Sequence, residues 1–231
     1  MRDKWIKKIK AFWKGWGYTL LISILIATSF KSVIADWNIV PTGSMNPTIL
    51  EGDRIFVNKL AYDLKIPYTT WHVAQWNDPR RGQIAVFYSP RDGRRMVKRV
   101  IGTPGDTIAM RNNRLFINGE AVVYEPLESD PGAMEKNAET PVLIYSEDLD
   151  GIRHPVMVMP QRPALRSFGP LQVPEGKYLM MGDNRDNSAD FRYFGFVERR
   201  DIVGQATAIV ISLDILNKYA PRWSRFFTRL S

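Results

Sequence analysis

Short runs in which apolar and polar residues alternate recur through most of the chain and predict β-strands. Turns containing Pro, Gly or Asn separate these runs, and Asn118-Gly119, set between Leu-Phe-Ile and Ala-Val-Val, is a strong hairpin signal. The pattern therefore predicts a mainly β, antiparallel body with little helix. The predicted strands cover residues 54–57, 83–88, 95–101, 107–110, 114–117, 142–145, 156–159, 177–181 and 202–211.

One segment near the N-terminus has a different pattern. Residues 16–34, WGYTLLISILIATSFKSVI, are mostly apolar and carry one charge, at Lys31. In a helix, about 19 residues reach roughly 28 Å, close to the hydrocarbon thickness of a bilayer. A cleavable signal peptide also has a basic start and an apolar middle, and is the alternative. We predict a retained transmembrane helix because the basic region before it is long, with six Lys or Arg in residues 1–15.

The charge of the chain is concentrated at its two ends. The formal net charge is +8, of which residues 1–35 carry +6 and residues 218–231 carry +4, so residues 36–217 carry −2. A nucleic-acid-binding protein needs its basic charge on the folded body, so we exclude nucleic acid as a partner. The basic residues before the apolar span predict that residues 1–15 are cytoplasmic and residues 36–231 lie outside.

The last residues of the chain have aromatic side chains at helical spacing. Trp223, Phe226, Phe227 and Leu230 fall at i, i+3, i+4 and i+7, with three arginines on the flank. This spacing predicts an amphipathic helix that lies on the surface of an anionic bilayer. The alternative is a terminal segment whose aromatic side chains pack on the β body.

Few residues of the chain can supply a nucleophile and its base. There is no Cys, and the two histidines, His72 and His154, lie in Pro-rich or polar stretches that predict loops, with no acidic partner at a recognisable spacing. The motif PTGSMNPT presents Ser44 after a turn, and MVKRVIGTPGD places Lys98 among apolar neighbours. A lysine can activate a serine when burial lowers its pKa from the usual value of about 10.4. We therefore predict a Ser/Lys pair.

Three sequence blocks resemble the type I signal peptidases of bacteria. The first surrounds Ser44, the second surrounds Lys98, and the third reads GDNRDNSAD. They occur in the family's order behind an apolar N-terminal segment. The third block of the family usually reads Ser-x-Asp-Ser-Arg, and this chain has Phe191 at the second serine, so any polar contact of that serine is absent. The matched segments cover residues 40–59, 82–106 and 174–208.

The resemblance implies catalytic roles for residues of these blocks. Ser44 is expected to be the nucleophile and Lys98 its general base. The backbone amide of Ser44 and the hydroxyl of Thr42 are expected to bind the oxyanion. The Ser188 hydroxyl is expected to orient the lysine amine.

The resemblance also implies supporting and substrate-binding residues. Asp190 and Arg192 lie two apart, and on an extended strand they would pair and hold the Ser188 loop, unless they form only a surface pair. The substrate is expected as an added β-strand before Ser44, with small residues at positions −1 and −3 in shallow apolar pockets. Each residue implied for these pockets could equally be an ordinary core residue: Val40, Met45, Ile49, Ile55, Val86, Met96 and Val97. No cofactor or metal is expected.

The resemblance implies the following organisation of the chain. A basic cytoplasmic segment, residues 1–15, precedes a transmembrane helix, residues 16–34, and an antiparallel β catalytic domain, residues 36–231. Within this domain, residues 124–168 are rich in acidic, polar and Pro residues and are expected to form a smaller inserted β subdomain.

The implied function is a membrane-anchored serine endopeptidase that removes N-terminal signal peptides from exported preproteins. Its partners would be signal peptides and the lipid bilayer. It would lie in the bacterial inner membrane as a single-pass protein, with the catalytic domain in the periplasm. Two alternatives remain. One is a specialised processing peptidase of a conjugation or secretion system, and the other is a membrane-tethered β scaffold with a degenerate dyad.

Overall fold

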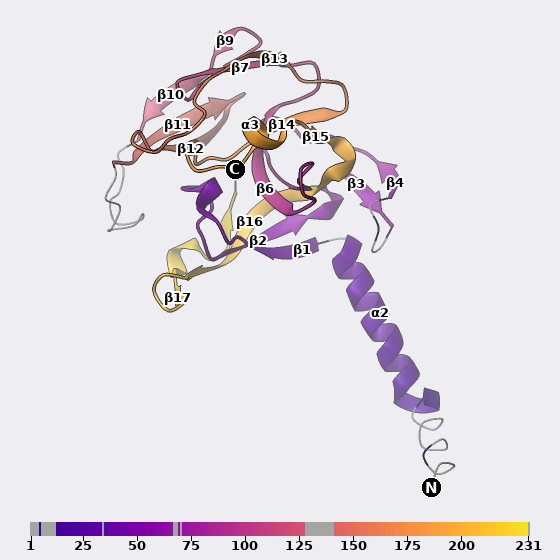
Figure 1. Ribbon diagram of the computed structural model, residues 1–231. Helices are drawn as coiled ribbons and strands as arrows, with labels where there is room; N and C mark the ends of the chain where they lie inside the picture. The colour runs from indigo at the N-terminus through magenta and orange to yellow at the C-terminus, as the bar shows by residue number, and fades with distance from the viewer. Residues whose placement is uncertain are drawn as a thin grey trace.

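The computed structural model describes residues 5, 13–33, 35–66, 69, 71–127 and 141–230. Of the predicted basic segment, only residues 5 and 13–15 are described, and residues 128–140 of the predicted insertion lie outside the description. The described chain is mainly antiparallel β behind an N-terminal helix, as the sequence pattern predicted (Figure 1).

Every strand that the alternation predicted is present, with ends shifted by a few residues. These strands are β2 (Asp53–Asn58), β5 (Ile84–Tyr88), β6 (Arg95–Gly102), β7 (Thr107–Arg111), β8 (Arg114–Ile117), β11 (Leu143–Leu149), β12 (Ile152–Val158), β14 (Lys177–Met181) and β16 (Ile202–Asp214). Shorter strands add to them: β1 (Ala35–Ile39), β3 (Asp63–Lys65), β4 (His72–Gln75), β9 (Glu120–Ala121), β10 (Val123–Pro126), β13 (Phe168–Gln172), β15 (Val197–Glu198), β17 (Ala220–Pro221) and β18 (Thr228–Arg229).

The largest sheet has the strand order β1-β2-β16-β5-β6-β14-β15. Strand β16 comes from near the end of the chain and lies between β2 and β5. The pairing of β16 with β2 shifts register twice, which bends the strands and curls the sheet. A buried apolar cluster fills the curl and contains Val40, Met45, Ile49, Ile55, Val57, Ile84, Val86, Val203, Ala206 and Ile209.

Two smaller sheets, β13-β7-β8-β9 and β10-β11-β12, form the other part of the body (Figure 1). Asn118 and Gly119 join β8 to β9 with φ of 53° and 89°. Positive φ at both positions is what a two-residue hairpin turn needs, which confirms the hairpin signal. Strands β10, β11 and β12 cover most of the described part of the predicted insertion, residues 124–168.

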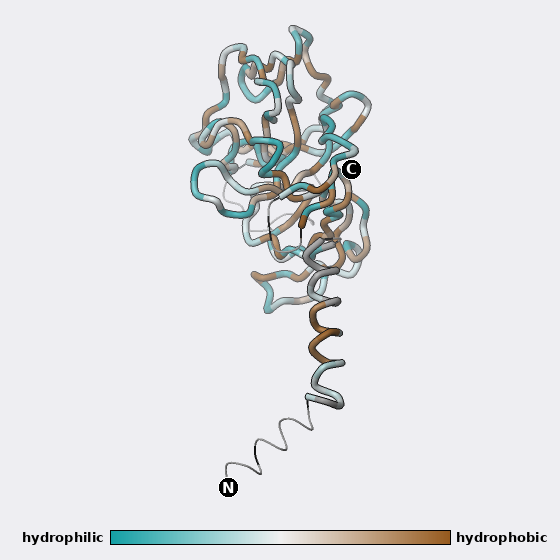
Figure 2. The backbone as a smooth tube through the Cα atoms, turned by 90° about the vertical axis from the view of Figure 1, so that its right-hand side faces the viewer, coloured by the Kyte–Doolittle hydropathy of each residue, from teal (hydrophilic) through white to brown (hydrophobic). Residues whose placement is uncertain are grey.

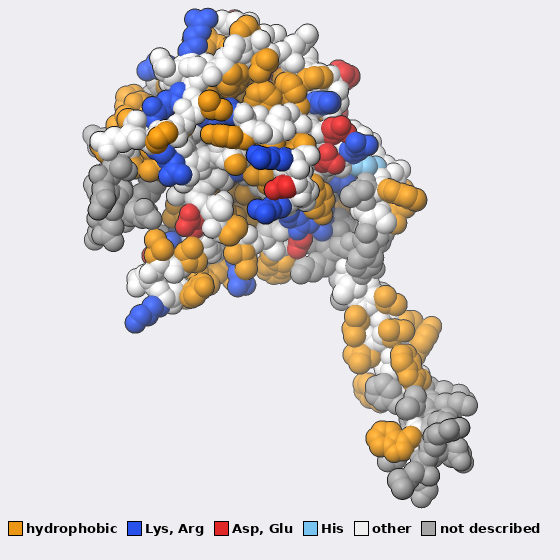
Figure 3. Space-filling view, in the orientation of Figure 1, with side chains coloured by type: hydrophobic (Ala, Val, Ile, Leu, Met, Phe, Trp, Pro, Cys, Tyr) orange, Lys and Arg blue, Asp and Glu red, His pale blue; other side chains and the backbone are white. Residues whose placement is uncertain are grey.

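The N-terminal segment is helical and projects away from the β body (Figure 1). A π-helical turn, Trp13–Gly17, leads into the α-helix α2, Tyr18–Val33. The middle of α2 is apolar (Figure 2), and apolar side chains such as Leu20 and Ile24 are exposed on it (Figure 3). In the part of the chain that the structure describes, no helix has both the length and the apolar character needed to cross a membrane.

The C-terminal residues do not form the predicted amphipathic helix. A single 3-10 turn, Trp223–Arg225, is followed by Phe227 at φ 56° and by β18, which pairs with β16. Leu230 then packs against the main core. An isolated segment of this length is a poor helix former, and the free edge of β16 offers backbone hydrogen bonds instead. The tail therefore pairs with the protein's own β body through its backbone and Leu230, but the aromatic side chains of Trp223 and Phe227 stay mostly exposed, so the alternative of a docked aromatic stripe is met only in part.

Candidate active site

Ser44 and Lys98, which are 54 residues apart, meet at the surface of the main core. Ser44 lies in the 3-10 helix η2 (Gly43–Met45) after β1, and Lys98 lies in the middle of β6. The Nζ atom of Lys98 is 2.5 Å from Oγ of Ser44 and donates to the Val97 carbonyl at 3.1 Å. Both residues are buried, with 8% of Ser44 and 2% of Lys98 exposed.

The burial of Lys98 changes its protonation. Loss of solvent lowers the pKa of the ammonium to about 8, although the carboxylates of Asp190 and Asp183 raise it in part. In the described part of the chain, Lys98 contacts Ser44 and Val97 and no carboxylate directly. With a pKa of about 8, roughly a tenth of the lysine is neutral at pH 7 and can accept a proton.

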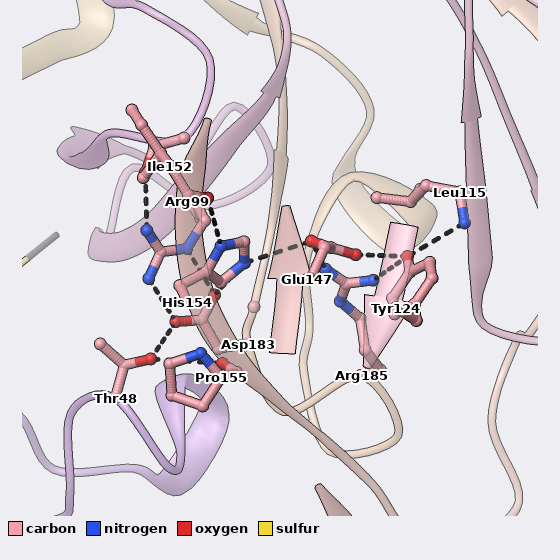
Figure 4. A network of polar contacts seen from close by, with 12 residues as sticks. Thr48, Arg99, Leu115, Tyr124, Glu147, Ile152, His154, Pro155, Asp183 and Arg185 are labelled. Atoms are coloured by element: carbon pink, nitrogen blue, oxygen red, sulfur yellow. Dashed lines mark hydrogen bonds and ion pairs between the residues drawn. The ribbon is translucent and has the colours of Figure 1, made fainter. Parts of the chain in front are cut away.

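The next residue along β6, Arg99, is buried on the other face of the strand. Its Nε and Nη2 atoms donate to the two carboxylate oxygens of Asp183 at 2.9 and 2.8 Å, and Nη1 donates to the Gly82 carbonyl at 2.6 Å. The Thr48 hydroxyl donates to the same carboxylate at 2.5 Å (Figure 4). Arg99 holds the pKa of Asp183 below its usual range although burial alone would raise it. Both members of this pair therefore stay ionised.

The loop after β14 packs directly on the turn that carries Ser44. Asn184 donates from its backbone amide to the Ser44 carbonyl and from its side chain to the Gly43 carbonyl, both at 3.1 Å. A Cβ atom on Gly182 would lie 2.3 Å from both the Ser44 carbonyl oxygen and the Ser188 Oγ. The close approach of loop and turn therefore requires glycine at position 182.

Ser188 does not make the hydrogen bond expected for it. Its Oγ atom is buried and has no hydrogen-bond partner among the residues that the structure describes. The atom lies beside Gly182, next to the turn that carries Ser44. The role of Ser188 in orienting Lys98 therefore stays a prediction.

Asp190 and Arg192 form a buried pair, but not on an extended strand. Asp190 is the N-cap of the short helix α3 (Phe191–Phe194) and accepts hydrogen bonds from the backbone amide and the guanidinium of Arg192, the latter at 2.8 Å. The strand prediction was wrong because a carboxylate favours capping a helical turn. Arg192 also donates to the Arg185 carbonyl at 2.6 Å, so the pair braces the loop.

Phe191, at the position where the family usually has a serine, has an apolar environment. Its ring is 5.6 Å from that of Phe168 and 4.8 Å from that of Phe196. It packs against the cluster of buried side chains between the main sheet and the smaller sheets. An aromatic contact therefore replaces any polar contact at this position.

The inserted strands hold the same loop from its other side. Backbone hydrogen bonds join Met157 of β12 to Asp183 at 2.8 Å and to Arg185 at 2.9 Å. Arg185 forms an ion pair with Glu147 of β11, and the Glu147 carboxylate also contacts the Tyr124 hydroxyl (Figure 4). The loop is thus held between the Ser44 turn and the insertion.

Both histidines lie on strands, so the prediction of loop histidines was wrong. His154 is a buried residue of β12 whose Nε2 atom is 3.1 Å from the Glu147 carboxylate. His72 begins β4 and is 3.1 Å from the Asp63 carboxylate. Each partner lies on the adjacent strand of a hairpin, β11 beside β12 and β3 beside β4, and the sequence pattern did not predict strands at the two histidines that would have placed the partners opposite them. Among the described residues, no group of three metal-ligating side chains lies together.

A cleft of about 610 Å³ opens beside Ser44 and Lys98. Thr42 lies on its wall with an exposed side chain that makes no capping hydrogen bond. Met45 and Ile49 do not line it, because they are fully buried in the main core. The other apolar residues expected at the pockets do line the cleft: Val40, Ile55, Val86, Met96 and Val97. Sequence reasoning missed Asn38, Ile39, Pro41, Asp92, Arg94, Arg95, Asn187 and Ala189.

Two unpaired strand edges flank this cleft in the described structure. Strand β1 pairs only with β2. The half of β6 from Arg95 to Lys98 pairs with β5, while its pairing with β14 begins at Arg99. The two free edges can therefore hydrogen-bond to an extended chain placed in the cleft.

Comparison with known proteins gives a consistent set of matches. The family model described as signal peptidase, peptidase S26, matches residues 13–211. Signal peptidase I of Pseudomonas fluorescens is 36% identical over 209 residues, covering 85% of this chain and 72% of the relative. For signal peptidase I of Pseudomonas aeruginosa the identity is 34% with the same coverage. Signal peptidase I P of Bacillus subtilis subsp. natto is 33% identical, covering 86% of this chain and 89% of the relative.

Among solved structures, a signal peptidase I from Enterococcus faecalis is 34% identical to this chain. It aligns over 57% of this chain and 98% of its own chain, with a TM-score of 0.34.

Proposed function

We propose that this chain cleaves signal peptides from exported proteins, because it belongs to the signal peptidase family, peptidase S26. Ser44 is the nucleophile and Lys98 is its general base. The proposal rests above all on the 2.5 Å contact between Nζ of Lys98 and Oγ of Ser44 in a buried site. The lowered pKa of Lys98 supports it, since only the neutral amine can accept the serine proton.

The reaction proceeds in two halves. Neutral Lys98 takes the hydroxyl proton as Oγ of Ser44 attacks the carbonyl carbon of the scissile peptide bond. When the tetrahedral intermediate collapses, the protonated lysine gives that proton to the leaving amine, and the signal peptide stays bound to Ser44 as an ester. Lys98 then deprotonates a water molecule that hydrolyses the ester, which frees the signal peptide and restores Ser44.

The oxyanion of the intermediate needs hydrogen-bond donors at the same place. The backbone amide of Ser44 and the hydroxyl of Thr42 are the proposed donors. Thr42 is two residues before the nucleophile on the wall of the cleft, and its exposed hydroxyl makes no capping hydrogen bond that would compete. Ser188 is proposed to orient the lysine amine, and its buried, unpartnered Oγ leaves it free to do so when substrate binds.

The substrate binds as an extended strand between the free edges of β1 and β6. Main-chain hydrogen bonds to both edges position the scissile bond at Ser44, and alternate side chains enter the cleft. The buried side chains of Val40, Ile55 and Val86 line the cleft, and we expect shallow apolar pockets there. Such pockets favour small residues at positions −1 and −3.

We also propose that residues 16–34 keep the enzyme at the bacterial inner membrane, with residues 1–15 in the cytoplasm and the catalytic domain, residues 36–231, in the periplasm. The support is the exposed apolar surface of α2, its place directly before β1, and the six basic residues in front of it. The N-terminus of the substrate, also apolar and membrane-bound, would then reach the cleft from the same side.

The test is cleavage of a precursor with an Ala-x-Ala site by the full-length protein in detergent. The wild type should make one cut, and both Ser44→Ala and Lys98→Met should abolish it while the far-ultraviolet circular dichroism stays unchanged. Ser224→Ala and Lys218→Met, at exposed positions outside the cleft, are matched controls that should cleave normally. Cleavage by Ser44→Ala or Lys98→Met would overturn the assignment.

A further inference from the structure

An arginine bridges the two free edges at the end of the cleft away from Ser44. Nη1 of Arg95, the first residue of β6, donates to Oδ2 of Asp36 and to Oδ1 of Asn38, both at 2.8 Å. Asp36 and Asn38 lie on β1, and Arg95 and Asn38 line the cleft. The bridge therefore crosses between the strands that would flank a bound substrate.

The bridge uses only part of the guanidinium. Among the described residues, Nε and Nη2 of Arg95 have no hydrogen-bond partner, and the planar group lies 5.8 Å from the centre of the Tyr88 ring. About a third of the side chain is exposed, 32%. Arg95 is thus held in place through Nη1, while the N–H groups of Nε and Nη2 remain available to donate two parallel hydrogen bonds to a carboxylate.

The charges around this end of the cleft do not cancel. Asp92 and Arg94 form an ion pair at 3.3 Å, and Asp36 is shared by Arg95 at 2.8 Å and Lys59 at 3.7 Å. These five groups sum to one positive charge. Arg95 holds the pKa of Asp36 below its usual range although burial would raise it, so the aspartate stays ionised. The net positive charge therefore comes from Arg95 and Lys59, which share the single carboxylate of Asp36.

The distance from the nucleophile sets which substrate residue meets this group. Arg95 precedes Lys98 by three positions on β6, which at about 3.3 Å per residue is roughly 10 Å. A substrate strand has the same rise, so the residue opposite Arg95 is three or four before residue −1. This end of the cleft adjoins β1, which begins beside α2, so the upstream part of the substrate faces it (Figure 1).

We propose that Arg95, held by Asp36 and Asn38, is a subsite that binds an acidic side chain at position −4 or −5 of the substrate and disfavours lysine or arginine there. This subsite rests on the proposed function. It makes Arg95 a specificity-determining residue that acts on binding of the substrate and not on the proton transfers at Ser44.

The test uses the full-length protein in detergent at low salt and peptides that differ only at position −4 or −5, with Glu, Gln or Lys. At one of these positions, the wild type should favour Glu over Lys in kcat/KM by about fivefold, the size of one exposed charge pair. The difference should lie mainly in KM. Arg95→Gln should remove the preference, and Arg95→Glu should reverse it in favour of Lys.

Arg200→Gln is the matched control. Arg200 forms an exposed ion pair with Glu198, with 2.7 Å between the charged atoms, and it does not line the cleft. It should keep the preference of the wild type. Equal cleavage of the Glu and Lys peptides by the wild type, or a preference that survives in Arg95→Gln, would overturn the subsite alone. No cleavage of any peptide by the wild type would overturn the proposed function and the subsite with it.

Discussion

Lys98 and Arg99 are consecutive residues of one strand, and both are buried cations, but their surroundings differ. Arg99 makes two hydrogen bonds to the Asp183 carboxylate, at 2.9 and 2.8 Å. Lys98 faces Ser44 and the Val97 carbonyl, and its pKa falls to about 8. The strand alternation sends one cation to a paired network and the other to a site without a counter-ion. Burial without a direct counter-ion lowers the pKa of the lysine ammonium, whereas a guanidinium keeps its proton and is here stabilised by a carboxylate partner.

The largest expected effect comes from making Lys98 resemble its neighbour. Lys98→Arg keeps a positive charge, but a guanidinium does not lose its proton in a protein. Cleavage, measured as kcat/KM on the Ala-x-Ala precursor, should fall at least about 10⁴-fold. Arg99→Lys is the reciprocal control and should keep measurable cleavage, since an ammonium can still face Asp183. Activity of Lys98→Arg within tenfold of the wild type would break the comparison.

Removing the counter-ion of Arg99 should destabilise the fold. Asp183→Asn leaves a buried guanidinium without its carboxylate, which should lower the free energy of unfolding by about 3 to 5 kcal/mol. Asp150→Asn, which breaks the ion pair of Arg81 with a carboxylate that is 66% exposed, should cost less than about 1 kcal/mol. Urea unfolding at neutral pH measures both. Equal losses in the two variants would mean that burial does not set the strength of these pairs.

Removing the charge of Lys98, which has no direct counter-ion, should stabilise the fold. The pKa of Lys98 is about 8 in the folded state against 10.5 when unperturbed. Between these two pKa values the folded state binds fewer protons than the unfolded state. The charged lysine therefore lowers the free energy of unfolding by its full amount below pH 8, and this destabilisation disappears as the pH rises to the pKa of the unfolded state. Lys98→Met should raise the free energy of unfolding by up to about 3 kcal/mol at pH 7. The gain should shrink toward zero near pH 11, and a gain that does not depend on pH would contradict this account.

The smallest effect is the pH dependence of the reaction itself. If neutral Lys98 is the base, kcat/KM should rise about tenfold between pH 7 and pH 9 and then level off, as expected for a group with a pKa of about 8. Initial rates on the Ala-x-Ala precursor at constant ionic strength measure the profile. A flat profile across this range, or a limb near the ordinary lysine pKa, would show that Lys98 is not the group that titrates.

Much of the fold could be predicted because the signals are local. Alternation of apolar and polar residues located the long strands, and Asn118-Gly119 located a hairpin whose φ angles fit the turn. The C-terminal tail was misread because its aromatic spacing favours a helix, whereas pairing with β16 decides its conformation. That pairing joins residues on different strands and leaves no periodic mark in the sequence.

The residues of the candidate site also fall into those that local sequence signals predicted and those that only the folded sheet brings together. Ser44 and Lys98 could be proposed because each lies in a motif, and the structure brings the two side chains into contact. Arg95 and Asn38 could not, because they face each other only when the sheet curls and brings β6 opposite β1. Met45 was assigned to a pocket because it is apolar and beside the nucleophile, but the turn of η2 directs it into the core.

The strand order of the main sheet also governs when the enzyme can become active. The nucleophile lies between β1 and β2, the proposed base lies on β6 next to β5, and β16 is the strand that joins these two halves of the sheet. Because β16 is synthesised late, a nascent chain that lacks it holds Ser44 and Lys98 on separate pieces of sheet. Contacts between distant residues also form slowly. The Ser44 and Lys98 side chains can therefore meet in the arrangement of the complete sheet only once β16 has been added between β2 and β5.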